Sequence, residues 1–181
     1  MAYEFDPVNV EKAKKYLELA REMFPDGSPA LARFYGNLAA VCGALRDFDR
    51  QLEYCRTELS LLLGAATLDR LELADCYSSL GSCYGSRGEY PLELEYQRNA
   101  LDIRRELLPP NHPDLADSYS RVGSALCHTQ SIAEGLEHQE KALRIRELSL
   151  PPDHLDLASS HINLASACYL LHRNRDALDH L

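Results

Sequence analysis

The 181-residue sequence has no two cysteines separated by two residues and no Asn-X-Ser/Thr glycosylation site. It has no run of the roughly 20 apolar residues that a membrane-spanning helix requires. Its first part contains no apolar segment after a basic region. These absences exclude a transmembrane protein and give no support to secretion. We therefore expect a cytoplasmic protein that does not bind membranes.

Basic residues are few relative to acidic ones. The chain contains 19 Lys and Arg against 28 Asp and Glu, and its net charge is −9 at pH 7. Sequence-independent binding to nucleic acids depends on Lys and Arg side chains that neutralise phosphates. The charge balance therefore argues against a nucleic-acid partner and favours a basic or neutral protein or peptide.

A long repeat runs through the chain. The segment LLPPNHPDLA at residues 107–116 returns as SLPPDHLDLA at residues 149–158, and this offset is the length of one repeat. The same offset aligns two features, each of which occurs four times. One is an alanine, and the other is an apolar residue followed directly by a small one. These residues are Ala32, Ala74, Ala116 and Ala158, then Leu38–Ala39, Leu80–Gly81, Val122–Gly123 and Leu164–Ala165. Periods of this length are typical of solenoid proteins.

Each repeat contains two segments in which apolar residues are spaced by three and four positions, as on one face of an α-helix. No segment shows the strict alternation of a half-buried strand. Prolines recur between the repeats, where they end one helix and begin the next. The sequence therefore predicts an all-α fold, a right-handed α-solenoid of antiparallel helix pairs.

We expect a single array over residues 1–181. It begins with an unpaired helix of the second type at residues 8–23. Four repeats follow at residues 29–62, 69–107, 112–149 and 155–181, the last of them incomplete. Their predicted helices are 29–44, 47–62, 69–86, 90–107, 112–128, 132–149, 155–171 and a short one from residue 174. Asp47, Ser131 and Asn174 are candidate helix caps, and Gly88 is suited to a turn.

The second repeat resembles a tetratricopeptide repeat. In the segment CYSSLGSCYGSRGEYPLELEYQRNALDIRRELLP, residues of the expected type occupy the motif's apolar, small, aromatic, turn, aromatic and small positions. They are Leu80, Gly81, Tyr84, Gly88, Tyr90 and Ala100. The segments ALDIRRELLPPNHPDLA and ALRIRELSLPPDHLDLA further resemble the longer repeat of kinesin light chains and of arrays in signalling NTPases. The resemblance covers nearly the whole chain and implies a protein-interaction scaffold.

Several residues depart from the tetratricopeptide pattern. Gln51 and Glu93 replace a usual alanine, and Glu58 replaces another. Gln97 and Gln139 occupy a position that is usually aromatic. We expect the second helices to pack more loosely or with more polar contacts at these places, or to direct the polar side chains to solvent.

The resemblance implies that the first helix of each pair lines a concave groove. Small hydroxyl and amide groups are frequent there, and Asn37 and Asn163 match a paired-asparagine region in which amides bind a peptide backbone. Small residues also serve close packing, so the pattern alone does not decide between packing and binding. The residues expected to contact a peptide are Arg33, Asn37, Ser78, Ser82, Ser120, Arg121, Ser124, His128, Asn163, Ser166 and Tyr169.

Other kinds of site have little support. Arg33, Arg121 and His128 are too few and too separated to form a carboxylate clamp for a chaperone terminus. His112 and His154 occupy the same position one repeat apart, so they do not converge as zinc ligands. We expect no metal, no cofactor and no catalytic activity. We also expect free and mostly buried thiols at Cys42, Cys55, Cys76, Cys83, Cys127 and Cys168.

The sequence thus predicts a scaffold that binds a peptide or helical segment of a partner protein in its groove. The alternative is a structural or regulatory segment of a longer array, which acts as an oligomerisation surface or as the sensor half of a signalling NTPase. Six apolar residues favour the alternative, because no predicted helix follows to cover them. They are Leu164, Tyr169, Leu170, Leu171, Leu178 and Leu181. We expect this end to continue into further repeats or to self-associate.

Overall fold

The computed structural model describes residue 19, residues 23–24 and residues 28–180. Every regular element among them is an α-helix, which confirms the predicted fold class. None of these helices is long and apolar enough to cross a bilayer. The chain divides into two compact units, residues 1–69 and residues 70–181, so the single continuous array stays a prediction. Almost all of the predicted helix 8–23 lies outside the described residues, as does Leu181.

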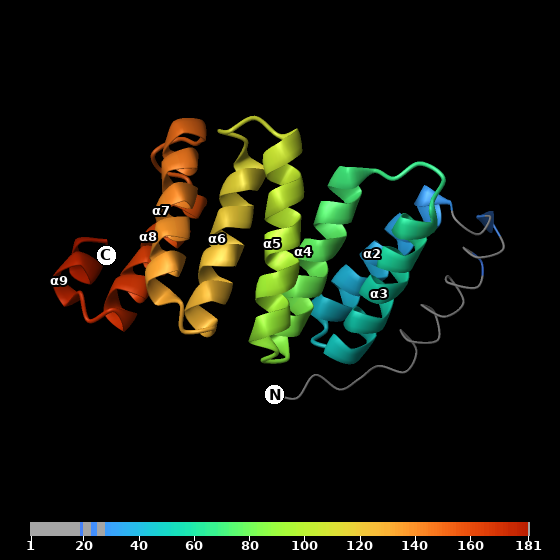
Figure 1. Cartoon of the computed structure of the whole chain (residues 1–181), viewed down its shortest axis with the longest axis horizontal. Helices are drawn as coiled ribbons and strands as arrows, with labels where there is room; N and C mark the ends of the chain where they lie inside the picture. Colours follow the sequence, from blue (N-terminus) through green and yellow to red (C-terminus); the bar gives the residue numbers. More distant parts are fainter. Residues whose placement is uncertain (1–18, 20–22, 25–27, 181) are drawn as a thin grey trace. The chain divides into compact units, whose positions relative to one another are not determined.

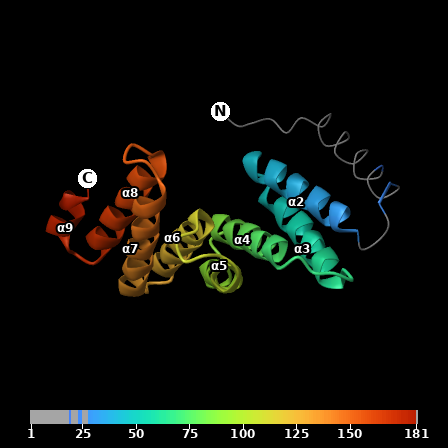
Figure 2. The ribbon, with the colours of Figure 1, turned by 90° about the horizontal axis from the view of Figure 1, so that it is seen from above.

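The described part of the first unit is one helix pair. Helices α2 (Pro29–Ala44) and α3 (Phe48–Gly64) pack side by side, as both views show (Figures 1 and 2). The side chains of Ser28 and Asp47 cap the two helices by accepting hydrogen bonds from backbone N–H groups in the first turns. The predicted cap at Asp47 is therefore confirmed. Tyr35, 3% exposed, packs in the core of this pair.

The second unit contains three successive helix pairs, and each helix packs against the next one in the chain. Its helices are α4 (Arg70–Ser86), α5 (Tyr90–Leu107), α6 (Pro113–His128), α7 (Ile132–Ser149), α8 (Leu155–Leu170) and α9 (Asn174–Asp179). Figure 1 shows them following one another in chain order. The predicted ranges agree with these bounds to within one residue at the ends of α4 to α8, because the apolar periodicity and the prolines specify both the helices and their limits.

A residue with left-handed backbone closes the turn inside each helix pair. Arg46, Gly88, Gln130 and His172 have φ angles of 60°, 76°, 67° and 59°, and they occupy the same position of successive repeats. The residue after each one donates its backbone N–H to a carbonyl oxygen near the end of the first helix, as Ser131 does at 2.9 Å. Glycine adopts this conformation at little cost, which confirms the prediction for Gly88. The other three turns hold non-glycine residues in the same geometry.

The connectors that precede α6 and α8 end in histidine caps, which the repeat pattern did not predict. The Nδ1 atoms of His112 and His154 accept hydrogen bonds from the backbone N–H two residues later, at 3.2 and 3.1 Å. Two predicted caps differ from expectation. Ser131 is the N-cap residue of α7 but makes no side-chain cap bond. The prediction for Asn174 is wrong, because Arg173 occupies the equivalent N-cap position, one repeat after Ser131.

Glycines lie where the two helices of a pair approach most closely. Gly81 on α4 and Gly123 on α6 are buried, as the repeat pattern predicts for a helix interface. A Cβ atom at Gly81 would lie 2.6 Å from Nε2 of Gln97. A Cβ atom at Gly123 would lie 2.9 Å from Nε2 of Gln139 and 3.0 Å from the carbonyl oxygen of Gly135. Neither position has room for a side chain.

Candidate functional site

Two buried glutamines hold the helices of the second and third pairs together. Gln97 on α5 and Gln139 on α7 are 2% and 1% exposed. Oε1 of Gln97 accepts a hydrogen bond from the Ser78 hydroxyl at 3.2 Å, and Nε2 donates to the Ser78 carbonyl at 3.1 Å. Gln139 makes the same two bonds with Ser120, at 3.1 and 2.9 Å. The prediction of more polar packing is therefore confirmed at Gln97 and Gln139. The alternative that these side chains reach solvent is wrong, because a serine opposite each amide supplies both a donor and an acceptor.

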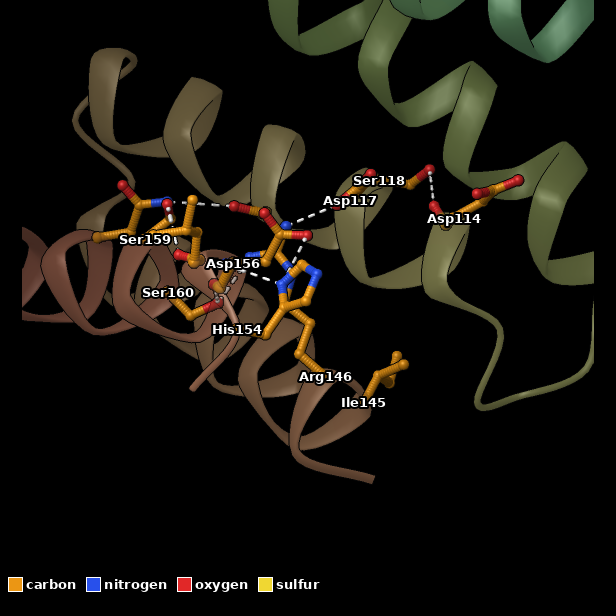
Figure 3. Close-up of polar contacts among 12 residues, drawn as sticks. Asp114, Asp117, Ser118, Ile145, Arg146, His154, Asp156, Ser159 and Ser160 are labelled. Atoms are coloured by element: carbon orange, nitrogen blue, oxygen red, sulfur yellow. Dashed lines mark hydrogen bonds and ion pairs between the residues drawn. The ribbon is translucent and has the colours of Figure 1, made fainter. Parts of the chain in front are cut away.

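Two buried arginines, Arg104 and Arg146, join successive pairs, and Figure 3 shows the contacts of Arg146. Arg146 on α7 donates from Nη1 to the Ser160 hydroxyl on α8 and from Nη2 to Oδ1 of Asp117 on α6, both at 2.6 Å. Arg104 makes the equivalent contacts one repeat earlier. The Arg146 side chain is 9% exposed, whereas that of Asp117 is 55% exposed. Each arginine thus holds three helices in place and fixes an aspartate at the exposed side of a first helix.

Adjacent first helices are linked by two side chains at the register of the paired asparagines. Arg121 on α6 donates from Nη1 to the Ser82 hydroxyl on α4 at 2.9 Å. Asn163 on α8, one repeat later, donates from Nδ2 to the Ser120 hydroxyl on α6 at 3.2 Å. These bonds place α4, α6 and α8 next to one another along one side of the second unit.

The predicted peptide contacts fall into three groups. Arg33 and Asn37 are exposed on α2 of the first unit. Ser78 and Ser120, each 8% exposed, are engaged by the buried glutamines. The remaining residues are exposed or half-buried on α4, α6 and α8, and we call them the first-helix surface. They are Ser82, Arg121, Ser124, His128, Asn163, Ser166 and Tyr169.

The first-helix surface contains a hollow of about 240 Å³. Its walls come from α6, α7 and α8, and they combine hydroxyl, amide and imidazole groups with a few apolar atoms. The lining residues are Ser124, Cys127, His128, Gln139, Asn163, Ser166, Ala167 and Leu170. Four of the predicted contacts therefore meet around one depression, although they come from two different repeats.

His128 is held at the rim of this hollow by groups of the preceding helix pair. Its Nδ1 lies 2.9 Å from Oε2 of Glu93 on α5, and its ring centroid lies 4.6 Å from that of Tyr90. The Glu93 side chain is only 11% exposed, whereas that of His128 is 45% exposed. In the repeat pattern, Glu93 stands out only as a departure from alanine. The structure gives it a role, because its carboxylate orients the imidazole.

The exposed end of the last described pair is apolar. A hollow of about 600 Å³ lies there between α8 and α9. Ile162, Tyr169, Leu170 and Leu178 line it and are 57%, 68%, 48% and 71% exposed. One repeat earlier the first three of these positions hold serine, cysteine and histidine. The expectation of an exposed apolar end is confirmed for Tyr169, Leu170 and Leu178. It is wrong for Leu164, which is 1% exposed because it packs in the core between α7, α8 and α9, and Leu171 is partly buried against the same core.

The cysteines are free, and four of them are buried, as predicted. Burial raises the pKa of the Cys42, Cys127 and Cys168 thiols, which keeps them protonated near neutral pH and makes them poor nucleophiles. Among residues 28–180, no three His, Cys, Asp or Glu side chains converge as a metal site would require.

Two family models of the tetratricopeptide repeat match this sequence, over residues 73–114 and residues 114–181. The chain belongs to the tetratricopeptide repeat family. Proteins of this family generally serve as scaffolds for protein–protein interaction and are generally not enzymes. No curated protein matches the sequence.

Solved structures share the fold. The nearly identical TPR-like repeats of a putative kinesin light chain from Podosopora anserina have a TM-score of 0.79 at 17% identity, over 94% of this chain and 81% of that one. The apo form of RapI has a TM-score of 0.80 at 16% identity, over 94% of this chain and 60% of that one. BtubC (BKLC) from P. vanneervenii has a TM-score of 0.55 at 18% identity, over 95% and 86%. These similarities show the fold of a tetratricopeptide solenoid.

Proposed function

We propose that this chain is a cytoplasmic scaffold that binds an extended peptide or a helical segment of a partner protein on the first-helix surface. The observation that carries the proposal is the position of Arg121 and Asn163, which bridge successive first helices at the same register. A guanidinium has five N–H donors and a carboxamide has two donors and an acceptor. Each side chain therefore has hydrogen-bonding capacity beyond the bond to a serine hydroxyl described above.

Exposed carboxylates on the first helices support a peptide ligand that carries basic side chains. Asp75 and Asp117 are 70% and 55% exposed, and each uses one carboxylate oxygen to bind a buried arginine. The other oxygen can accept a hydrogen bond from a peptide N–H or a lysine. Because the net charge of the chain is −9, long-range attraction also favours a basic or neutral partner.

Truncation of the bridging side chains tests this proposal. Arg121→Ala and Asn163→Ala should each weaken binding of a peptide selected on the wild-type chain by about 0.5–3 kcal/mol, the cost of a lost hydrogen bond. Asn37→Ala tests the corresponding position of the first unit. Isothermal titration calorimetry measures the affinities, and circular dichroism checks that helicity and melting are unchanged.

Matched controls come from the second helices. Arg144→Ala on α7 removes an exposed side chain of the same type as Arg121, and Glu95→Ala on α5 removes an exposed charged side chain of a second helix. They should leave the affinity within the error of the measurement. Equal losses from Arg121→Ala and Arg144→Ala would place the binding site on the second helices and contradict the proposal.

A second candidate function is assembly through the apolar end, and the exposed Ile162, Tyr169, Leu170 and Leu178 favour it. In the interior of the second unit, α8 of the next pair packs beside the equivalent face of α6 and forms part of the smaller hollow there. We propose that a second copy of the chain covers the α8–α9 face in solution, because the same kind of helix–helix contact would remove these side chains from water. This use of the end would make the array an oligomerisation element.

Light scattering over a range of concentrations tests assembly. The average molar mass of the wild-type chain should rise with concentration. The Leu178→Glu chain should stay monomeric, because a charge in an apolar interface is costly to desolvate. Leu148→Glu, at an exposed leucine of α7, is the matched control and should leave association unchanged. A wild-type chain that stays monomeric at all concentrations would eliminate this function and leave peptide binding unaffected.

A further inference from the structure

A series of ring pairs runs through the repeats. In each pair, a ring on the first helix packs against a ring on the second helix or just after it, and the series recurs once per repeat. The pairs are Tyr35–Tyr54, Tyr77–Tyr96, Tyr119–His138 and His161–His180, with centroid distances of 6.0, 5.9, 5.9 and 5.4 Å. Packing explains the first three pairs, because tilted rings at such distances are favourable. The fourth pair has the same geometry but consists of two imidazoles.

The two imidazoles of the fourth pair present their nitrogen atoms to each other. Nδ1 of His161 lies 3.2 Å from Nδ1 of His180. At this distance one Nδ1–H donates a hydrogen bond to the other Nδ1, and the tautomers of the two rings decide which is the donor. When both neutral rings carry their proton on Nε2, both Nδ1 lone pairs become available to a cation, which two tyrosines in this position could not offer. Both residues are half-buried, so solvent and ions reach them.

This separation matches the distance between two ligands of one metal ion. A zinc ion binds imidazole nitrogen at about 2.0–2.1 Å, and at a tetrahedral angle two such nitrogens lie about 3.3 Å apart. A small rotation of the two rings would therefore direct both lone pairs to one shared point. We infer that His161 and His180 form a chelating site for a divalent transition-metal ion of the zinc class, for which imidazole is a preferred ligand.

The remaining coordination positions of such an ion are open. No third His, Cys, Asp or Glu converges with this pair among the residues that the structure describes. The ion therefore keeps water molecules, which an incoming ligand can replace. It also connects α8 to the residue that follows α9, so binding stabilises the contact of the last helix with its neighbour. The repeat spacing did not predict this site, because His161 and His180 occupy different positions of one repeat.

Calorimetric titration of the full chain with Zn²⁺ tests the inference. The wild-type chain should bind one equivalent and melt at a higher temperature when Zn²⁺ is present. His161→Tyr recreates the tyrosine found at the corresponding position of the preceding repeat. It should retain the fold and lose the bound equivalent together with the thermal shift, and His180→Tyr should behave in the same way.

The third ring pair supplies both a control and a gain of function. His138→Tyr should leave Zn²⁺ binding unchanged, because Tyr119 provides no second nitrogen. Tyr119→His should add a second bound equivalent, since it creates a pair of imidazoles at that position. NMR spectra of the imidazole nitrogens should show Nδ1 of His161 and His180 shifted by Zn²⁺. No binding at millimolar Zn²⁺, or binding that His161→Tyr retains, would overturn the inference.

Discussion

Replacing Gly123 with leucine is expected to lower the free energy of unfolding by about 3 kcal/mol, the upper part of the range for overpacked cores. A Cβ atom there meets Nε2 of Gln139 at 2.9 Å and the carbonyl oxygen of Gly135 at 3.0 Å. The glutamine side chain can move only by giving up its buried bonds to Ser120. The carbonyl oxygen belongs to the backbone of α7, so the whole helix must shift to make room.

Urea denaturation followed by circular dichroism measures this loss. Gly64→Leu is the matched control, since no atom lies within 4 Å of a Cβ built at that position. The loss of unfolding free energy caused by Gly81→Leu should lie between those of Gly123→Leu and Gly64→Leu, because the atoms closest to a Cβ at Gly81 all belong to the side chain of Gln97. If Gly123→Leu unfolds at the same urea concentration as the wild-type chain, the close approach of α6 and α7 is wrong.

Arg146→Met should lower the free energy of unfolding by about 1.5–3 kcal/mol, the value of hydrogen bonds to charged groups. Methionine keeps much of the length and apolar contact of the side chain but none of its donors. The Ser160 hydroxyl keeps its bond to the Asp156 carbonyl but loses the arginine donor, as does one oxygen of Asp117. The loss should stay below that of a fully buried ion pair, because water reaches Asp117 and hydrates its carboxylate.

Arg144→Met controls for the loss of an arginine from the same helix. Its side chain is 71% exposed and contacts Glu140 at 3.7 Å, so we expect a change of at most about 0.5 kcal/mol. A double-mutant cycle with Ser160→Ala isolates the hydrogen bond between α7 and α8. Additive effects of the two substitutions would show that Arg146 does not couple the two pairs through this serine.

The sequence predicted the helices and their pairing because both depend on properties that recur in every repeat. Apolar spacing defined which face of each helix is buried, and the small residues Gly81 and Gly123 marked the interface. The turn at Gly88 was predictable because glycine accepts the left-handed backbone conformation. Arg46, Gln130 and His172 adopt that conformation too, and their identity gave no such signal.

The polar contacts of the interior were harder to predict, because they depend on side-chain direction. Gln97 and Gln139 occupy a position that is usually aromatic, and only the structure shows a serine opposite each amide. A signal for the arginine contacts was present in the sequence. Asp117, Arg146 and Ser160 each have an identical residue one repeat earlier. Residues that recur as a set of complementary partners predict a contact better than any one of them does alone.

The candidate site was predicted in outline only. The register placed Arg121, Asn163 and His128 on first helices, where the structure has them. It did not reveal that Ser78 and Ser120 are buried and bound by glutamine, which removes two expected contacts from the accessible surface. Nor did it reveal Glu93, which binds His128 from the preceding pair. Whether a small residue serves helix packing or ligand binding depends on the side chain that lies opposite it, which the sequence does not reveal.

The most direct test of peptide binding is an NMR titration of the 15N-labelled full chain with a peptide selected on it from a random library. Saturable shifts should concentrate on α4, α6 and α8, with Ser82, Arg121 and Asn163 among the residues that change most. The Arg121→Ala chain should show the same pattern only at higher peptide concentration. Shifts that concentrate instead on the exposed faces of α5 and α7, around Glu95 and Arg144, would contradict a site on the first-helix surface.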